Sequence, residues 1–310
     1  MTVDKISHRM SDWLDVGNGH SLYWQQFGNP AGIPVLLIHG GPGAGMDIYL
    51  HEYFDLAKTN LIMFDQRGAG KSTASDRLGC NTTAHLTDDC ARILKNFDIK
   101  EAVIIGGSWG ATLAIEFAKK YRKLCKKLIV YSTFLARPQD EKWFLKGSRQ
   151  FFPDYWKNFT AGFSDTEKEN IAQTYWEKFN NLNTEESLIL ASQFLTYMNR
   201  LLFLEEPQNK KATQATLEDL NFIKLFLHYS RNSYFLGHDG ILKDVELLAG
   251  LQGEIIHGRY DMDAPVCGAY ELSKAWPDAT LRIVPGCGHS DRELPMEKFL
   301  KKCFQDRIIV

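Results

Sequence analysis

The chain has 310 residues, of which 44% are hydrophobic and 24% are charged, as is usual for a globular enzyme. Its 36 lysines and arginines against 38 acidic residues give a net charge of −2, which offers no electrostatic reason to expect nucleic acid or an anionic membrane as a partner. The N-terminus lacks the apolar core of a secretory signal, and no apolar run reaches the roughly 18 residues that span a bilayer, so we expect a cytoplasmic protein whose six scattered cysteines stay reduced.

Strand patterns come first in chain order. Two segments, 13–16 and 21–27, flank Gly17-Asn18-Gly19 and predict a hairpin. Beyond them lie short, nearly continuous apolar runs of the kind found in strands that are covered on both faces, at 33–39, 60–65, 102–106, 127–132, 253–257 and 280–284.

Helical patterns follow several of these runs. Within 81–97 the apolar residues recur at steps of three and four, which describes one face of a helix, and 109–120 and 268–275 are further candidates. The alternation of strands and helices predicts the α/β class, with a mainly parallel sheet and helices on both of its faces.

This alternation stops between residues 134 and 240. The stretch is rich in aromatic residues and helical in pattern, with two long helices expected at 188–204 and 217–234. Because the strand pattern resumes at 253, we interpret 134–240 as an all-helical cap inserted into a core of residues 1–133 and 241–310. The alternative is a separate helical domain with its own task.

A pentapeptide of a type found at catalytic sites lies between a predicted strand and a predicted helix. Gly106-Gly107-Ser108-Trp109-Gly110 matches G-x-S-x-G, in which small flanking residues allow a sharp turn that exposes the serine hydroxyl. The helix N-terminus would place the backbone N–H of Trp109 where a developing oxyanion would lie. The alternative is a glycine-rich turn without a catalytic role. The strand–turn–helix setting favours Ser108 as a nucleophile.

A second glycine-rich loop, His39-Gly40-Gly41-Pro42-Gly43, directly follows the run at 33–39. A loop of this type supplies the second oxyanion N–H in α/β-hydrolases, and we expect Gly41 to be that donor. The alternative is a plain Gly-Pro turn. We expect His39 to support the loop rather than to act as a base.

A nucleophilic serine needs a base, and the base needs a carboxylate that orients it. His289 and Asp261 each follow one of the last two predicted strands, at the edge of the sheet where Ser108 also lies. The chain order Ser108, Asp261, His289 is the order expected for α/β-hydrolases. Asp263 is a competing acid that lies farther from the strand end. These residues predict a serine mechanism, for which we expect no cofactor.

One further motif suggests a different function, the binding of a nucleotide phosphate. Residues 65–72 follow a strand and contain Gly70-Lys71-Ser72, like the end of a phosphate-binding loop. That loop requires a glycine five residues before Gly70, where this chain has Asp65. We therefore reject a nucleotide-binding function.

Five motifs in this order and spacing, HGGPG, DQRGAGKS, GGSWGATLA, HGRYD and GCGHS, resemble the proline iminopeptidase (prolyl aminopeptidase) family, from about residue 11 to residue 304. The resemblance implies an α/β-hydrolase fold with a helical cap and a metal-free serine mechanism that releases N-terminal proline from peptides. It implies that Ser108 is the nucleophile, that Asp261 orients His289, and that Trp109 and Gly41 form the oxyanion hole.

The cap departs from the family pattern. Family members hold the free amine of the substrate with cap glutamates, and Arg231 and Asn199 stand where this chain would carry them. Arg231, Asn199 and Tyr234 are therefore the candidate substrate-binding residues, with Glu205 or Glu206 as substitute carboxylates. Because an arginine would repel a substrate ammonium, we expect Arg231→Glu to raise activity on a proline arylamide.

Three functions follow from these observations. The first is a proline iminopeptidase-like serine hydrolase acting on a small molecule or short peptide. The second keeps the chemistry but takes another ester or amide, with Arg231 contacting an anionic group. The third is a non-catalytic binding protein with a hydrolase fold, since a fold alone does not establish an activity. No oligomeric state is predicted.

Overall fold

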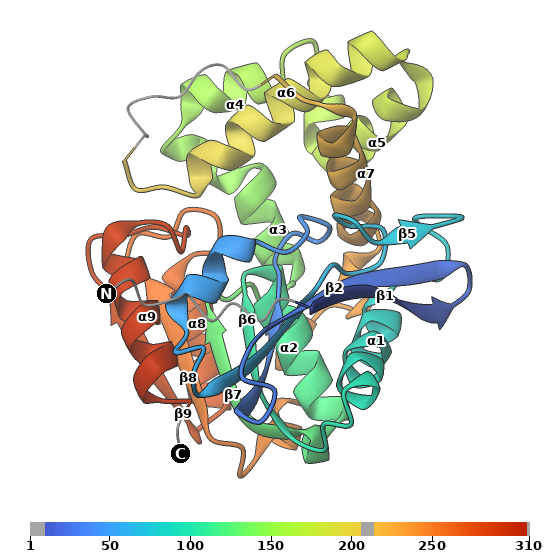
Figure 1. Ribbon diagram of the computed structural model, residues 1–310. Coiled ribbons are helices and arrows are strands. Elements are labelled where there is room, and N and C mark those ends of the chain that lie inside the picture. The colour runs from blue at the N-terminus through green and yellow to red at the C-terminus, as the bar shows by residue number, and fades with distance from the viewer. Residues whose placement is uncertain (1–9, 206–213, 309–310) are drawn as a thin grey trace, which may run out of the picture.

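The computed structural model describes residues 10–205 and 214–308. Among them, nine strands form one sheet in the order β1-β2-β4-β3-β6-β7-β8-β9, with β5 paired to β2 (Figure 1). The strands are β1 Met10–Gly17, β2 His20–Gly28, β3 Ile33–Ile38, β4 Thr59–Phe64, β5 Thr73–Ala74, β6 Ala102–Gly107, β7 Cys125–Tyr131, β8 Gly253–Gly258 and β9 Ala279–Val284. The helices are α1 Thr83–Asn96, α2 Trp109–Lys120, α3 Pro138–Leu145, α4 Pro153–Phe159, α5 Ile171–Asn181, α6 Thr184–Leu201, α7 Leu217–Arg231, α8 Val266–Ala275 and α9 Leu294–Asp306.

The sheet is antiparallel at one end and parallel over the rest. β1 and β2 form the predicted hairpin, whose turn at 17–19 has positive φ at all three residues. β2 also pairs with β4 in antiparallel fashion, whereas every pair from β4–β3 to β8–β9 is parallel. The predicted α/β class with a mainly parallel sheet is confirmed.

Each face of the sheet carries its own apolar core. Along β3, Leu36 and Ile38 belong to one core with residues of α1, α2 and α8, and Val35 and Leu37 belong to the other with residues of α9. Successive strand residues point to opposite faces, so a strand that is covered on both sides must be apolar throughout. This requirement explains the continuous apolar runs in the sequence.

Helices α3 to α7 stand together above one edge of the sheet (Figure 1). They share a third apolar cluster that draws its buried members from residues 144–227. The last turns of α7 pack differently, because Leu225 and Tyr229 belong to the core around α1 and α2. Helix α7 therefore ties the helical layer to the sheet layer.

The two long helices of this layer begin and end at positions that their caps explain. α6 begins at Thr184, before the predicted residue 188, because Asn183 and Glu186 form a reciprocal capping box. α7 ends at Arg231. It does not extend to the predicted residue 234, because Tyr234 has a positive φ of 52° that a right-handed α-helix does not allow. No helix in the described ranges is both long enough and apolar enough to cross a membrane.

Candidate active site

Ser108 lies at the turn between β6 and α2, as the pentapeptide motif predicts. Its φ of 55° and ψ of −125° are rare for a residue with a side chain. The backbone is held there by a hydrogen bond from its N–H to the Tyr131 carbonyl at 3.0 Å and by the first bond of α2, from Ala111 N–H to the Ser108 carbonyl at 2.9 Å.

The flanking glycines allow the chain to pass close to its neighbours. A Cβ on Gly106 would lie 2.1 Å from the carbonyl oxygen of Gly110, and a Cβ on Gly107 would lie 2.2 Å from the ring of Tyr131. On Gly110, a Cβ would lie 2.2 Å from the Ile38 carbonyl oxygen. The motif therefore has a steric cause, because each of these positions excludes any larger residue.

The loop after β3 is fixed against the same turn. His39 Nδ1 donates to the Gly40 carbonyl at 2.8 Å, and His39 Nε2 accepts from the Gln66 backbone N–H at 2.9 Å. The Gln66 side chain donates to the His39 carbonyl and accepts from the Trp109 indole at 2.9 Å. Both His39 ring nitrogens are thus occupied, and burial lowers the pKa of this imidazole. His39 supports the loop that carries Gly41.

His289 and Asp261 form a buried pair. His289 Nδ1 donates to Asp261 Oδ2 at 2.8 Å. The other carboxylate oxygen, Asp261 Oδ1, accepts from the backbone N–H groups of Asp263 at 3.0 Å and Ala264 at 2.8 Å. The competing acid, Asp263, is instead 3.9 Å from His289 Nε2. Asp261 therefore lies on the Nδ1 side of the His289 imidazole, and Asp263 lies on its Nε2 side.

A second imidazole, which the sequence analysis did not single out, contacts the same carboxylate. His257 is fully buried at the end of β8, and its Nε2 is 3.2 Å from Asp261 Oδ2 and 2.7 Å from the Ala264 carbonyl. Its Nδ1 accepts from the Thr133 backbone N–H at 3.1 Å, so the hydrogen must be on Nε2. The Nε2–H therefore donates to the Ala264 carbonyl, its nearer acceptor, and also faces Asp261 Oδ2. The sequence signal that could have identified His257 is its position at a strand end, four residues before Asp261.

These contacts set the protonation of the site. Burial alone would raise the pKa of Asp261, but the charge on His289 and the hydrogen bonds from His257 and His289 hold it below its usual range. Burial alone would lower the pKa of His289, but Asp261 and Asp263 stabilise the imidazolium and raise it to about 9. Burial and the repulsion from Asp261 raise the pKa of Asp263 to about 6.

Ser108 and His289 face one cavity of about 300 Å³ between the sheet edge and the helical layer. Among the residues that the structure describes, no hydrogen bond joins Ser108 Oγ to His289 Nε2, a contact that often tightens only when substrate is bound. Helices α3, α6 and α7 and the residue after α6 supply an apolar wall, formed by Phe144, Leu195, Met198, Leu202, Phe222 and Phe226.

An adjoining hollow of about 720 Å³ extends this cavity. The two spaces share the lining residues Ala44, Leu195, Asn199 and Phe222, so they lie next to each other. The outer space has polar walls that include Lys71, Arg77, Glu218 and Asp219. A smaller, mainly apolar cavity at Ser108 thus lies next to a larger polar one.

The predicted substrate-binding residues separate in the structure. Asn199 lines the cavity. Arg231 is not among the cavity residues, because its guanidinium donates to the Gln173 side chain at 2.7 Å and stacks over the Trp176 ring at 4.5 Å, on the face of α7 that meets α5. Tyr234 is buried against Trp109 and Phe134 and does not line the cavity either. Glu206 lies outside the described residues.

The Gly-Lys-Ser segment serves a structural purpose. The Asp65 carboxylate accepts from the backbone N–H groups of Met46 at 2.6 Å and Lys71 at 2.7 Å. A Cβ on Gly70 would lie 2.4 Å from this carboxylate. The loop closes around an acidic side chain, which leaves no space and no favourable charge for a phosphate.

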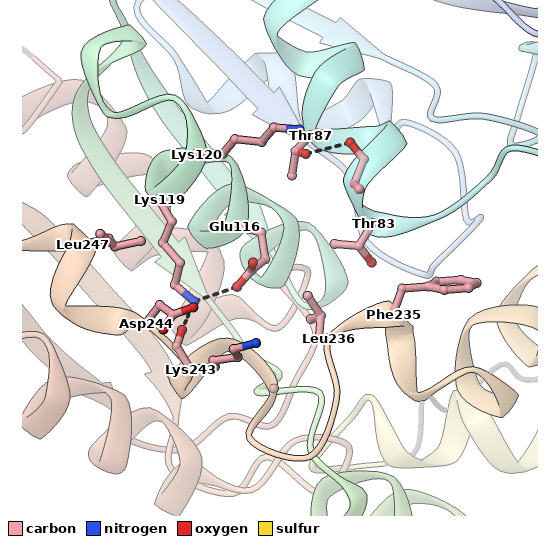
Figure 2. Close-up of a pocket in the computed structure, with 12 residues that line it drawn as sticks. Thr83, Thr87, Glu116, Lys119, Lys120, Phe235, Leu236, Lys243, Asp244 and Leu247 are labelled. Carbon is pink, nitrogen blue, oxygen red and sulfur yellow. Dashed lines mark hydrogen bonds and ion pairs between the residues drawn. The ribbon is translucent and has the colours of Figure 1, made fainter.

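A separate cavity of about 320 Å³ lies between α1, α2 and the segment 235–247 (Figure 2). Its buried cation, Lys119, donates to Glu116 and to the carbonyls of Ile241 and Lys243, each at 2.7 Å. These acceptors fully occupy the ammonium group, so this cavity presents structural contacts rather than reactive groups.

Comparisons with known proteins show similarity at the level of the family and of the fold. Residues 33–293 match the model of the alpha/beta hydrolase fold family. The chain is 33% identical to the proline iminopeptidase of Xylella fastidiosa over 93% of this chain and 92% of that protein, and 30% identical to the proline iminopeptidase of Neisseria gonorrhoeae over 96% and 95%. Among solved structures, a proline iminopeptidase-related protein of Thermus thermophilus is similar with a TM-score of 0.65 at 18% identity, covering 96% of each chain. An esterase of Exiguobacterium antarcticum gives 0.66 at 18%, covering 94% of this chain and 97% of its own.

Proposed function

The chain belongs to the proline iminopeptidase family of α/β-hydrolases, and on that premise we propose that it is a serine hydrolase that releases N-terminal proline from short peptides. The observation that carries the proposal is the shared cavity of Ser108 and the His289–Asp261 pair. A strained serine beside a buried, carboxylate-oriented histidine is the arrangement that acyl transfer requires.

The proposed reaction has two halves. Ser108 Oγ attacks the carbonyl carbon of the N-terminal residue while His289 Nε2 takes the hydroxyl proton. The backbone N–H groups of Trp109 and Gly41 stabilise the oxyanion. His289 then gives its proton to the leaving amine, and the peptide bond breaks to leave an ester on Ser108. Water, deprotonated by His289, cleaves this ester to release proline and restore the hydroxyl.

We assign residues 134–240 as the cap and residues 1–133 and 241–310 as the core. The separate apolar cluster of α3 to α7 supports this division, and the packing of Leu225 and Tyr229 into the core supports a cap that is anchored through α7. The six free thiols support a cytoplasmic location.

The shape and polarity of the cavity support this choice of substrate. The apolar chamber at Ser108 suits a compact ring such as proline, and the outer polar hollow suits the rest of the peptide. The alternative with another acyl group rested on the replacement of the cap glutamates by Arg231 and Asn199. Because Gln173 and Trp176 hold Arg231 away from the cavity, only Asn199 still supports that alternative.

A substrate panel tests the proposal. We expect fast release of arylamine from a proline arylamide, slower release from alanine and leucine arylamides, and none from N-acetylproline arylamide. A fluorophosphonate probe should label the native protein at Ser108 and leave Ser108→Ala unlabelled. Failure on every N-terminal proline substrate would refute the proposed function, and absence of labelling would favour a non-catalytic binding protein.

A further inference from the structure

Apart from the His289 imidazole, the charged groups that line the active-site cavity are all acidic. Asp47, Asp263 and Asp291 line it, whereas none of the described lining residues is a lysine or an arginine. An N-terminal substrate residue carries an ammonium group next to its carbonyl. Moving that charge out of water is costly unless a carboxylate pairs with it. The cavity must therefore supply an acidic partner for the amine.

The three carboxylates differ in how strongly neighbouring groups already engage them. Asp47 accepts from the Arg292 guanidinium and from the Tyr49 backbone N–H at 3.2 Å. Asp291 accepts from the Tyr131 hydroxyl at 3.4 Å. The Asp263 carboxylate accepts no hydrogen bond from any residue that the structure describes, and it lies 3.9 Å from His289 Nε2. Asp263 is the carboxylate that remains available to a ligand.

The backbone fixes Asp263 in this position. Its N–H donates to Asp261 Oδ1 at 3.0 Å, and the preceding carbonyl, that of Met262, accepts from the Trp143 indole of helix α3 at 2.9 Å. The side chain is 15% exposed, and what is exposed faces the cavity. A carboxylate on a loop held from both the core and the cap needs little reordering when it binds a ligand.

Covalent geometry limits how far the substrate amine can lie from the reacting groups. The amine nitrogen of the N-terminal residue is about 2.5 Å from the scissile carbonyl carbon. That carbon must approach Ser108 Oγ to about 3 Å, and His289 Nε2 must then reach the same hydroxyl. These distances limit an anchor for the amine to within about 10 Å of His289 Nε2, and Asp263, at 3.9 Å, lies well inside that limit.

We infer that Asp263, a residue of the core loop after β8, binds the free amine of the substrate and selects for unblocked N-termini. This inference rests on the proposed function. It explains how the cavity accommodates a cation although Asn199 is uncharged and Arg231 lies elsewhere. An ammonium group would also relieve the repulsion from Asp261 that, after burial, raises the pKa of Asp263.

The test compares two substrates with the same ring. One is proline p-nitroanilide, which carries the amine, and the other is p-nitrophenyl cyclopentanecarboxylate, which lacks it. For Asp263→Asn we expect kcat/KM on the first to fall about 10- to 100-fold, as for loss of a charge-assisted hydrogen bond, and on the second to change less than about 3-fold at its pH plateau. Asp263→Glu, which keeps the charge, should retain more prolyl activity.

Asp291→Asn is the matched control, because it removes the same charge from the same cavity. We expect it to affect the two substrates by a similar factor. An equal loss on both substrates in Asp263→Asn would overturn the inference while leaving the function intact, and an amine-selective loss in Asp291→Asn would transfer the role to Asp291. A native protein that cleaves the ester but no prolyl substrate would refute the proposed function, and the inference with it. Thermal melting of each variant identifies losses that come from unfolding.

Discussion

The two walls of the active-site cavity are built in different ways. The core wall consists of strand ends and tight turns, where Ser108, Asp261 and His289 sit within a few residues of β6, β8 and β9. The cap wall comes from side chains of α3, α6 and α7, which are far apart in the sequence. Backbone sterics control the first wall, and helix packing controls the second. Chemistry therefore depends on local geometry here, whereas selectivity depends on tertiary contacts.

The largest effect should come from the core wall. Ser108→Ala removes the proposed nucleophile, and we expect kcat/KM on proline p-nitroanilide to fall by at least about 10⁴-fold. Thermal melting should change little, since Ser108 Oγ makes no hydrogen bond within the described residues. A variant that melts normally yet keeps a tenth of the native activity would show that Ser108 is not the nucleophile.

The second largest effect should come from the tight turn that carries Ser108. Gly106→Ala would place a Cβ 2.1 Å from the Gly110 carbonyl oxygen, and we expect a loss of about 3 kcal/mol or more in the free energy of unfolding. Gly162→Ala is the control, because Gly162 has a φ of 78° but no atom within 4 Å of the added Cβ. It should cost only about 1 kcal/mol of left-handed strain. Denaturant unfolding measures both, and equal losses would contradict the steric explanation.

His257 should act through Asp261 rather than on the substrate. His257→Phe removes the Nε2–H that faces Asp261 Oδ2, so we expect kcat to fall about 10- to 100-fold with little change in KM, on both the prolyl and the uncharged substrate. His257→Gln, which keeps a donor and an acceptor, should recover part of the activity. If His257→Phe melts earlier but keeps its kcat at low temperature, the residue serves stability alone.

The pH profile tests how the two acids share His289. As a base, His289 must be neutral, and its pKa is raised to about 9, so kcat/KM on the uncharged ester should rise with pH through that range. Asp263→Asn removes one of the charges that stabilise the imidazolium. The pKa of His289 must then fall, and the rising limb should move to lower pH. A limb that stays in place would mean that Asp263 does not act on His289.

The smallest effect should come from Arg231, on the outer face of the cap layer. Because its guanidinium contacts Gln173 and Trp176 rather than the cavity, we expect Arg231→Glu to change kcat/KM by less than about 2-fold and to cost about 0.5–1 kcal/mol in unfolding free energy. This replaces the increase in activity expected from the sequence. A large gain on proline p-nitroanilide would place Arg231 at the substrate after all.

Much of this protein could be predicted from local patterns. The apolar runs at β3, β4, β6, β7 and β8 indicated buried parallel strands because both of their faces are covered, and GGSWG indicated the turn at Ser108 because each glycine excludes a Cβ. The positions of Asp261 and His289 after consecutive strands followed from the rule that parallel strands end at one edge. The catalytic roles of these residues stay predictions.

The amino-acid sequence by itself thus determined the fold class, the family and the three side chains at the strand ends, because these depend on periodicity and on short-range sterics. Only the tertiary structure decided which acid lies on each side of His289, that His257 supports Asp261, and that Arg231 and Tyr234 are away from the cavity. Those outcomes depend on which face of α7 packs against α5 and on where the loops after β8 and β9 lie. No local pattern encodes either, because both are settled by side chains distant in the chain.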